Sequence, residues 1–355
     1  MSAVAVLNHY THIGSVISFT PYGNGHINAT CLVECADGCR YILQRINTSI
    51  FVHPEALMNN VKLVTEHIRR GVAAAGLDTS RCTLRIVRTD NGSTYCRDAE
   101  NGCWRMYDFV EGTVAKDRID SGEMFEACGE AFGRFQQQLS DFPAHQLTEV
   151  IPNFHNTPMR YEAFMRSVER DSIGRAGEVA DEITFVRERA EFAKTLEIAH
   201  AQGRLPLRVT HNDTKLNNIL FDNQSGMPVC VIDLDTVMPG YSVNDFGDAI
   251  RFAANTAAED ETDTSLVSLD LELYHRFAAG FLRGFGDAMT VDEIELMPIG
   301  ARMMTLECGM RFLADYLDGD VYFRTHRPRH NLDRARCQFA LVADMERKAE
   351  QMKLI

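Results

Sequence analysis

The chain has 355 residues, of which 45% are hydrophobic and 24% are charged, and its formal net charge is −14. The length favours two domains or one large domain with two lobes. The negative charge argues against a nucleic-acid backbone or an anionic membrane as the main partner, because both attract basic surfaces. A nucleotide is still compatible as a substrate, since local cations and backbone N–H groups can hold its phosphates in an acidic protein.

The sequence carries no targeting signal that we can identify. Its N-terminal residues lack the basic start and long apolar core of a signal peptide, and no apolar run approaches the length of a membrane span. The ten cysteines are mostly scattered within apolar runs, which is typical of a reducing compartment. We therefore expect a cytoplasmic protein, and nothing in the sequence requires an oligomer.

Residues 1–110 are rich in strand signals. Asp37-Gly38 lies between two β-rich runs, 30–36 and 40–46, and Asn91-Gly92 lies between 84–89 and 93–97, so we expect two hairpins. Another strand is expected over 104–110, and apolar residues recurring at three and four predict a helix over 54–70. This region reads as a small antiparallel sheet with one helix.

After Glu111-Gly112 the pattern becomes mainly helical. Helices are expected over 123–139, 160–172, 181–202, 269–285, 291–317 and 332–353. One strand pair, 219–221 and 229–232, lies among them. The sequence thus predicts an α+β protein with a β-rich lobe (1–110), a helical lobe (111–355) and a nucleotide in the cleft between them.

One run in the helical lobe carries most of the chemistry. His211-Asn212-Asp213-Thr214-Lys215-Leu216-Asn217-Asn218, followed by Val231-Ile232-Asp233, places a lysine, an amide and a second carboxylate 2, 5 and 20 residues after Asp213. Phosphoryl transfer from a magnesium nucleotide needs a proton acceptor, a cation and oxygen ligands, and the Asp-to-Asn spacing equals that of protein kinases. Asp213 is then the catalytic base, with an ordinary turn aspartate as the alternative. Lys215 would neutralise the moving phosphoryl group, or it is simply a solvated lysine.

Asn218 and Asp233 are the candidate magnesium ligands. Mg²⁺ is bound by a few protein oxygens together with waters and phosphate oxygens. Asp233 follows four apolar residues, and a carboxylate at the end of a buried strand is costly without a strong partner. Asp235 either joins the metal shell, binds substrate or accepts a hydrogen bond, and Asp245 is interpreted as a structural acceptor that ties the catalytic loop to a following helix.

Two further segments are candidates for binding ATP. Gly23, Asn24 and Gly25 lie between two strands, where glycines let backbone N–H groups approach phosphate; a plain hairpin turn is the alternative. His26, next in the chain, either points into the cleft or lies on the surface. The segment from Asp108 through Val110 to Gly112 ends a strand at the lobe boundary, and its backbone could bind an adenine ring.

A charged residue also stands out near the C-terminus. Arg311 follows Glu307-Cys308-Gly309-Met310 on an expected helix, and a buried arginine is expensive unless it is paired. It either binds substrate hydroxyls or a carbonyl, or forms a salt bridge with Glu307 four residues earlier.

Several of these runs resemble the aminoglycoside phosphotransferase/choline kinase-like family, a branch of the protein-kinase-like fold. The runs are 21–28, 40–44, 47–51, 207–220, 232–236 and 307–317. Within that family they are most similar to kinases that phosphorylate the anomeric hydroxyl of N-acetylhexosamines with ATP. The resemblance implies Asp213 as base, Mg²⁺ on Asn218 and Asp233, and a sugar pocket that uses His26, Thr236, Arg311 and Tyr322.

One feature departs from the kinase pattern. The third strand of a kinase usually supplies a lysine that pairs with a helix glutamate, but here Tyr41-Ile42-Leu43 is followed by Gln44 and Arg45. Arg45 is the candidate replacement for binding the nucleotide. Because side chains alternate along a strand, only one of Gln44 and Arg45 can point inward.

Two alternative functions remain open from the sequence. One is the same chemistry on another alcohol, such as a different sugar, choline or an aminoglycoside. The other is a nucleotide-binding regulator without catalysis, which would be marked by the loss of the base or a metal ligand.

Overall fold

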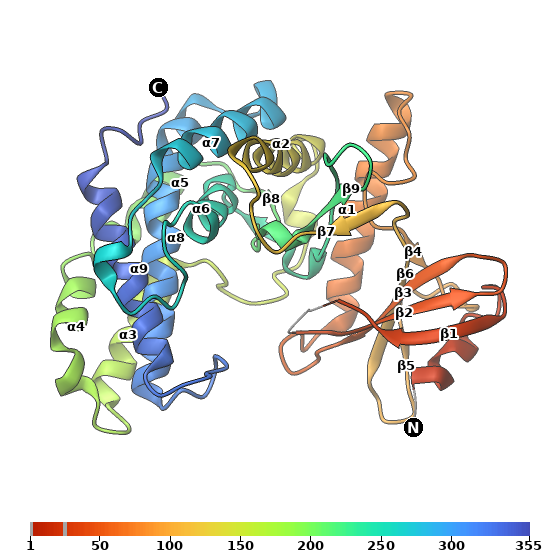
Figure 1. The fold of residues 1–355 in the computed structure, drawn as a ribbon, viewed down its shortest axis with the longest axis horizontal. Helices are drawn as coiled ribbons and strands as arrows, with labels where there is room; N and C mark the ends of the chain where they lie inside the picture. Colours follow the sequence, from red (N-terminus) through yellow and green to blue (C-terminus); the bar gives the residue numbers. More distant parts are fainter. Residues whose placement is uncertain (1–2, 24–26) are drawn as a thin grey trace. The chain divides into compact units, whose positions relative to one another are not determined.

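A computed structural model describes residues 3–23 and 27–355 (Figure 1). Asn24, Gly25 and His26, which we predicted to bind ligands, lie outside the described residues. The chain forms two compact units. Unit 1 contains Met1–Val114, Asp141–Pro152 and Leu220–Met238, and unit 2 contains Ala115–Ser140, Asn153–Ile219 and Pro239–Ile355. The fold class is α+β as predicted, with an antiparallel sheet in unit 1 and mostly helices in unit 2.

The main sheet of unit 1 has the strand order β1-β2-β3-β6-β4, and β5 also pairs with β6. Its strands are β1 (Val16–Pro21), β2 (Ala29–Cys35), β3 (Arg40–Ile46), β4 (Ile86–Val87), β5 (Cys96–Arg97) and β6 (Cys103–Asp108). The Asp37-Gly38 turn joins β2 and β3 as predicted, and Gly38 has a φ of 86°, which glycine adopts without a steric penalty.

The second predicted hairpin is wrong. A turn closes at Asn91-Gly92, where the Thr89 N–H donates to the Ser93 carbonyl. Beyond it, however, β4 pairs with residues 106–107 of β6 and β5 pairs with residues 103–104. Since β3 occupies the other edge of β6, the two short segments lie end to end along one edge. Their ladder partner is β6, so the local turn does not set the pairing.

The two faces of this sheet differ. One face is apolar and packs against η1 (Ala3–His9). Its buried side chains are Val33, Leu43, Trp104 and Met106 from the sheet, Val6 from η1 and Tyr10 directly after η1. The other face carries Gln44 and Arg105, which are direct partners in the register of β3 and β6. The helix α1 (Pro54–Ala74) begins at a proline and buries the predicted residues Leu57, Val61, Val64 and Ile68.

A second sheet lies mostly in unit 1 and contains the predicted strand pair. Its order is β10-β9-β7, formed by β7 (Thr113–Ala115), β9 (Ile219–Asp222) and β10 (Pro228–Val231). The Asp222 carboxylate accepts the Ser225 N–H at 2.8 Å and so holds the turn between β9 and β10. This hairpin joins the catalytic run to Asp233.

Unit 2 is built on packed helices. They are α2 (Gly122–Gln138), α3 (Thr157–Arg170), α4 (Ala180–Arg187), α5 (Thr195–Ala201), α6 (Ser242–Ala253), α7 (Leu271–Phe285), α8 (Val291–Asp318) and α9 (His330–Arg347). β8 (Arg208–Thr210) pairs with β11 (Met238–Gly240). The short 3₁₀ turns of unit 2 are η3 (Ala176–Val179), η4 (Phe192–Lys194), η5 (Leu216–Asn218), η7 (Thr264–Leu266) and η8 (Gly286–Ala288), whereas η2 (Ala144–Gln146) and η6 (Leu234–Thr236) belong to unit 1.

One predicted helix of unit 2 is interrupted. The single helix expected over 181–202 is instead broken into α4, η4 and α5. The Arg189 guanidinium donates to the Phe185 carbonyl at 2.7 Å, the acceptor that a continuous helix would offer to the Arg189 N–H.

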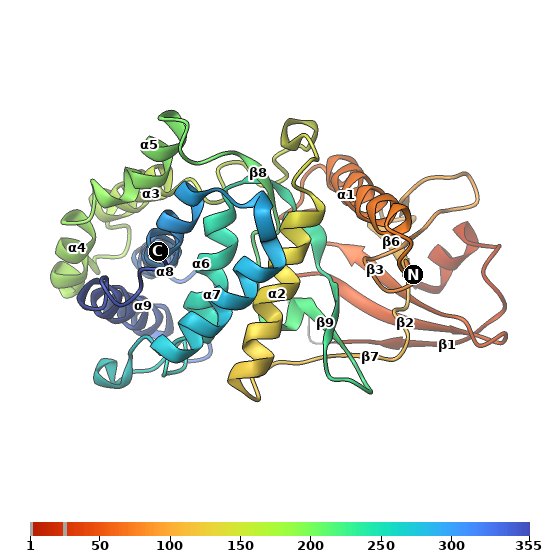
Figure 2. The same cartoon turned by 90° about the horizontal axis from the view of Figure 1, so that it is seen from above.

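The helices α2 and α7 lie side by side (Figure 2), and a Cβ at Gly280 would come within 1.9 Å of the Glu126 carbonyl oxygen. Glycine therefore permits this close packing. Within the described residues, every helix is too short or too polar to cross a lipid bilayer.

Candidate active site

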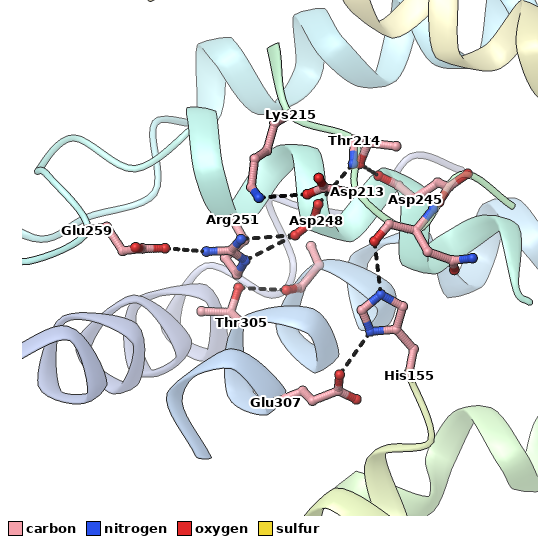
Figure 3. Close-up of polar contacts among 12 residues, drawn as sticks. His155, Asp213, Thr214, Lys215, Asp245, Asp248, Arg251, Glu259, Thr305 and Glu307 are labelled. Atoms are coloured by element: carbon pink, nitrogen blue, oxygen red, sulfur yellow. Dashed lines mark hydrogen bonds and ion pairs between the residues drawn. The ribbon is translucent and has the colours of Figure 1, made fainter. Parts of the chain in front are cut away.

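The catalytic loop between β8 and η5 is held through its backbone N–H groups by carboxylates of α6. The Asp245 carboxylate accepts the N–H groups of His211 and Asn212 at 2.8 and 2.7 Å. The Asp248 carboxylate, one turn later, accepts the Thr214 N–H at 3.0 Å (Figure 3). These bonds confirm the structural role predicted for Asp245. They also fix the left-handed conformation of Asn212, whose φ is 65°.

The Asp213 side chain is held on both of its oxygens. Lys215 Nζ lies 2.7 Å from Oδ1, and Asn218 Nδ2 donates to Oδ2 at 3.1 Å and to the Asp213 carbonyl at 2.8 Å. Burial acts to lower the pKa of Lys215, but the carboxylates of Asp213 and Asp248 outweigh it, so this pKa is raised and the ammonium stays charged. The loop thus presents an oriented carboxylate next to a permanent cation.

Arg251, Asp248 and Glu259 form an ion-pair network near Lys215. Arg251 of α6 donates to Asp248 at 3.0 Å and to Glu259 at 2.9 Å (Figure 3). Burial would raise the pKa of Asp248, yet the cations of Arg251 and Lys215 and the nearby His155 hold it below its ordinary value. Sequence analysis missed this network, although an Asp-to-Arg step of three residues on one helix was visible.

Asp233 and Asp235 occupy different environments in unit 1. Asp233 lies two residues after strand β10 in a left-handed conformation, with φ of 57°, and it is exposed. Asp235, in the turn η6, is only 3% exposed. The carboxylate whose burial is costly is therefore Asp235, whereas Asp233, for which we had expected that cost, is exposed.

Asp235 is neutralised by an arginine that the sequence analysis overlooked. Arg105 Nη1 on β6 lies 2.5 Å from Asp235 Oδ1, and the Arg105 side chain is 1% exposed. The Arg105 Nε donates to Gln44 Oε1 at 3.0 Å, and Asn28 donates to the other Asp235 oxygen at 2.6 Å. Asn28 in turn accepts the Asn47 N–H at 3.0 Å. An arginine inside the apolar strand 103–107 was the available signal, because a buried guanidinium demands a partner.

Arg45 lies on the other face of the sheet from Gln44. Its side chain is exposed and lies beside Gly102 and Asp98. Alternation along β3 therefore brings Gln44, and not Arg45, to the face that carries Arg105. The arginine bonded to Gln44 on that face is Arg105 of β6.

The two predicted magnesium ligands, Asn218 in unit 2 and Asp233 in unit 1, each have an oxygen of the kind that Mg²⁺ prefers. Because the Asn218 amide nitrogen donates to Asp213, its oxygen is directed away from that carboxylate and can serve as a ligand. Asp233 adds an exposed carboxylate in unit 1. The residues described here form no cluster of three His, Cys, Asp or Glu side chains able to hold a metal unaided. Mg²⁺ does not need one, since waters and substrate phosphates usually complete its shell.

The predicted nucleotide-binding residues lie as follows. Gly23 is exposed with φ of 73°. Asp108 ends β6, where its carboxylate lies 3.3 Å from Arg85 Nε and burial raises its pKa. The Val110 carbonyl accepts the Thr113 hydroxyl at 2.7 Å, which orders the turn at Gly112.

Arg311 on α8 is surrounded by aromatic rings. Its guanidinium carbon lies 5.8, 6.0 and 5.4 Å from the ring centres of Phe154, Tyr322 and Phe323. Among the carboxylates that the structure describes, none pairs with Arg311 within 4 Å, so the salt bridge to Glu307 that we considered does not form. Glu307 instead lies 2.9 Å from His155 Nδ1.

The segment that carries Tyr322 is fixed by one buried carboxylate. Asp315 accepts the N–H groups of residues 321, 322 and 323 at 2.8–2.9 Å. Thr236, the remaining predicted acceptor residue, is buried in η6 of unit 1. Arg311 and Tyr322 are thus brought together in unit 2.

Comparison with known proteins finds solved structures of similar fold and a matching protein family. Solved structures of similar fold include an aminoglycoside phosphotransferase from Alicyclobacillus acidocaldarius, which has 15% identity, a TM-score of 0.64 and coverage of 99% of this chain and 97% of that chain. They also include an amicoumacin kinase solved with AMP-PNP and Ca²⁺ (15%, 0.58, 98% and 94%) and a choline kinase from Cryptosporidium parvum (13%, 0.56, 95% and 91%). The model of the phosphotransferase enzyme family matches residues 18–289. The chain belongs to this family, and it has the protein-kinase-like fold.

Proposed function

We propose that this protein is an N-acetylhexosamine 1-kinase. It would transfer the γ-phosphoryl group of ATP, with Mg²⁺, to the anomeric hydroxyl of N-acetylglucosamine or N-acetylgalactosamine. Membership of the phosphotransferase family supports the transfer of a phosphoryl group. The choice of acceptor rests on one observation, the Arg311 guanidinium that lies among three aromatic rings and lacks a carboxylate partner within the described residues.

The reaction assigned to the catalytic loop is an in-line displacement. The anomeric oxygen forms a bond to the γ-phosphorus while the bond from that phosphorus to the bridging oxygen of ADP breaks. Asp213 accepts the proton of the attacking hydroxyl, and the bonds from Lys215 and Asn218 hold its carboxylate in one orientation. Lys215 places a permanent positive charge beside the transferred group.

Asn218 and Asp233 are proposed as the protein ligands of Mg²⁺. When bound, the ion neutralises charge on the nucleotide phosphates. Gly23, Asn24, Gly25, Asp108 and Val110 are proposed nucleotide contacts. In place of Arg45 we favour Arg105 as the cation that organises this part of unit 1, because it is buried and paired with Asp235.

The Arg311 environment favours a neutral acceptor that carries a carbonyl group. A guanidinium is a fixed cation with planar donors, so it binds a carbonyl or hydroxyl oxygen and repels an ammonium group. Tyr322 and Phe154 add apolar faces against which a sugar ring can lie. The acetamido group of an N-acetylhexosamine meets both requirements, whereas choline and aminoglycosides bring positive charge. Thr236 and His26 are proposed as further acceptor contacts.

The acceptor can be tested directly by ³¹P NMR. The protein is incubated with ATP, Mg²⁺ and each of N-acetylglucosamine, N-acetylgalactosamine, unmodified hexoses, choline and an aminoglycoside. We expect a sugar phosphate whose phosphorus couples to the anomeric proton. Turnover of choline without turnover of either N-acetylhexosamine would refute the proposal, and nucleotide binding without any product would point to a regulator.

The role of Arg311 gives a second arm to this experiment. Arg311→Ala is expected to raise the KM for the N-acetylhexosamine more than it lowers kcat, and to leave the KM for ATP unchanged. Losing a charged hydrogen bond of this kind costs about 1.5–3 kcal/mol, or roughly 10- to 150-fold. Arg324→Ala, which removes an exposed arginine from the same segment between α8 and α9 that carries Tyr322, serves as the control.

A further inference from the structure

His155 connects the catalytic loop to α8 and has no part in the chemistry assigned so far. It lies just before α3, and its side chain is 9% exposed. Its Nε2 lies 3.2 Å from the carbonyl oxygen of Asn212, the residue before the catalytic Asp213. Its Nδ1 lies 2.9 Å from Oε1 of Glu307, whose side chain is 1% exposed (Figure 3).

Both partners of the ring are acceptors. A carbonyl oxygen can only accept, so Nε2 must carry a proton. The Glu307 carboxylate accepts as well, and its second oxygen takes the Thr157 hydroxyl at 2.7 Å. A neutral imidazole has one N–H, whereas an imidazolium has two. Both bonds form together with an ionised Glu307 only if His155 is charged.

We propose that His155 is a positioning residue, held as an imidazolium between Glu307 and the Asn212 carbonyl so that the catalytic loop keeps Asp213 in its working orientation. In relation to kinase activity this inference rests on the proposed function. The Asn212 N–H is fixed by Asp245, and its carbonyl is fixed by His155, so both sides of this left-handed residue are restrained. Without the second restraint, the peptide that leads into Asp213 could rotate.

The charges around His155 come from three helices. Glu307 and Arg311 lie on α8, Asp248 lies on α6, and Arg160 on α3 donates to the carbonyl of the neighbouring Phe154 at 2.9 Å. Burial acts to lower the pKa of His155, but Glu307, Asp248 and the Asn212 carbonyl raise it above its ordinary value. Burial likewise acts to raise the pKa of Glu307, yet His155, Thr157 and Arg311 hold it down. The two shifts agree on an ion pair.

The same pair lies beside the proposed acceptor site. Phe154, the neighbour of His155, packs near Arg311, and Arg311 follows Glu307 by one helical turn. His155 therefore connects the catalytic loop to the helix that carries the acceptor-binding residue. Because the charged form makes the connection, it should persist at neutral pH and be lost as pH rises through the raised pKa of His155.

Histidine ¹⁵N NMR of the wild-type protein tests the charge state without any acceptor. We expect protons on both ring nitrogens of His155 at pH 7, with the signals assigned by their absence from His155→Gln. A ring with one unprotonated nitrogen at pH 7 would overturn the proposal. This result stands whether or not the protein phosphorylates an N-acetylhexosamine, so the two proposals can fail separately.

Kinetics then test the positioning role, using the acceptor with which the wild type is active. His155→Gln should lower kcat by on the order of 10- to 100-fold, because a small misplacement of a catalytic group has effects of this size, while the acceptor KM changes little. Glu307→Gln keeps a hydrogen-bonding side chain but removes the counter-charge, so the alkaline limb of kcat should move down by on the order of one pH unit.

The control for these variants is His12→Gln, which removes a histidine bonded to the exposed Asp90 at 2.9 Å in unit 1. It should leave the pH profile unchanged. An unaltered alkaline limb in Glu307→Gln, together with near-normal kcat in His155→Gln, would show that the His155–Glu307 pair is merely structural.

Discussion

At the scale of single residues, the sequence and the structure agree on which side chains surround Asp213. The spacing of Asp213, Lys215 and Asn218 predicted that the three would act together. The structure places both partners on the Asp213 carboxylate, at 2.7 and 3.1 Å. Local spacing was sufficient here because all three residues lie within six positions, so few backbone conformations can separate them.

Asp213→Asn should remove most of the turnover and leave the fold intact. The amide has nearly the same shape but cannot accept a proton from the attacking hydroxyl, and general-base catalysis typically contributes about 10²–10⁴-fold. We expect kcat to fall by that order with a circular dichroism spectrum like that of the wild type. Asp141→Asn, in which an exposed carboxylate bonded to His67 is changed, is the matched control. Normal turnover in Asp213→Asn would exclude it as the base.

Other functional residues were invisible to local spacing. Arg105 and Asp235 lie 130 positions apart, and His155 lies 152 positions from Glu307. Their pairing depends on sheet register and helix packing, which a single sequence does not encode locally. For Arg105 the sequence offered a signal, a charge inside an apolar strand, but it did not identify the partner; for the pairing of His155 with Glu307 it offered none.

At the scale of elements, α1 was predicted well because its apolar residues recur at helical spacing and are buried. α6 was missed. Its residues 242–251 are all buried although they include Asn244, Asp245, Asp248 and Arg251, residue types that a single sequence places on the surface or in a loop. This helix carries Asp245 and Asp248, and thus the element that holds the catalytic loop was the one that the pattern could not reveal.

The pair of Arg105 on β6 and Asp235 in η6 should be important for stability. Removing one partner of a buried ion pair leaves an uncompensated charge, so Arg105→Met should lower the free energy of unfolding by about 3–5 kcal/mol. Urea denaturation followed by fluorescence would measure the loss. Arg88→Met, which breaks a half-exposed pair with Glu66, should cost at most about 1 kcal/mol.

The double variant Arg105→Met/Asp235→Leu separates stability from function. With both charges replaced by apolar side chains, most of the stability lost in the single variant should return. Nucleotide binding should be impaired in the single and in the double variant, because in both Asn28 or Gln44 loses a partner that orders this part of unit 1. A double variant as unstable as Arg105→Met would contradict the assignment of the cost to an unpaired charge.

At the scale of the whole molecule, the acidic character of the chain has a consequence for its substrate. The net charge is −14, and three cations described above, two in unit 2 and one in unit 1, are already paired. Lys215 is bound to Asp213, Arg251 to Asp248 and Glu259, and Arg105 to Asp235. Side chains such as these bring little uncompensated positive charge to a triphosphate. The metal should therefore contribute to nucleotide binding as well as to the reaction.

This argument predicts a magnesium-dependent gain in thermal stability. A ligand that binds only the folded state stabilises it by about 2.7 kcal/mol at 100 times its Kd. AMP-PNP with Mg²⁺ should raise Tm clearly, and the same nucleotide with EDTA should raise it much less. Asp233→Asn should reduce the magnesium-dependent part, because it removes a proposed anionic ligand. Asp213→Asn is the sharpest control, since it should keep this stabilisation while losing turnover. Equal Tm gains with Mg²⁺ and with EDTA would show that binding does not need the metal.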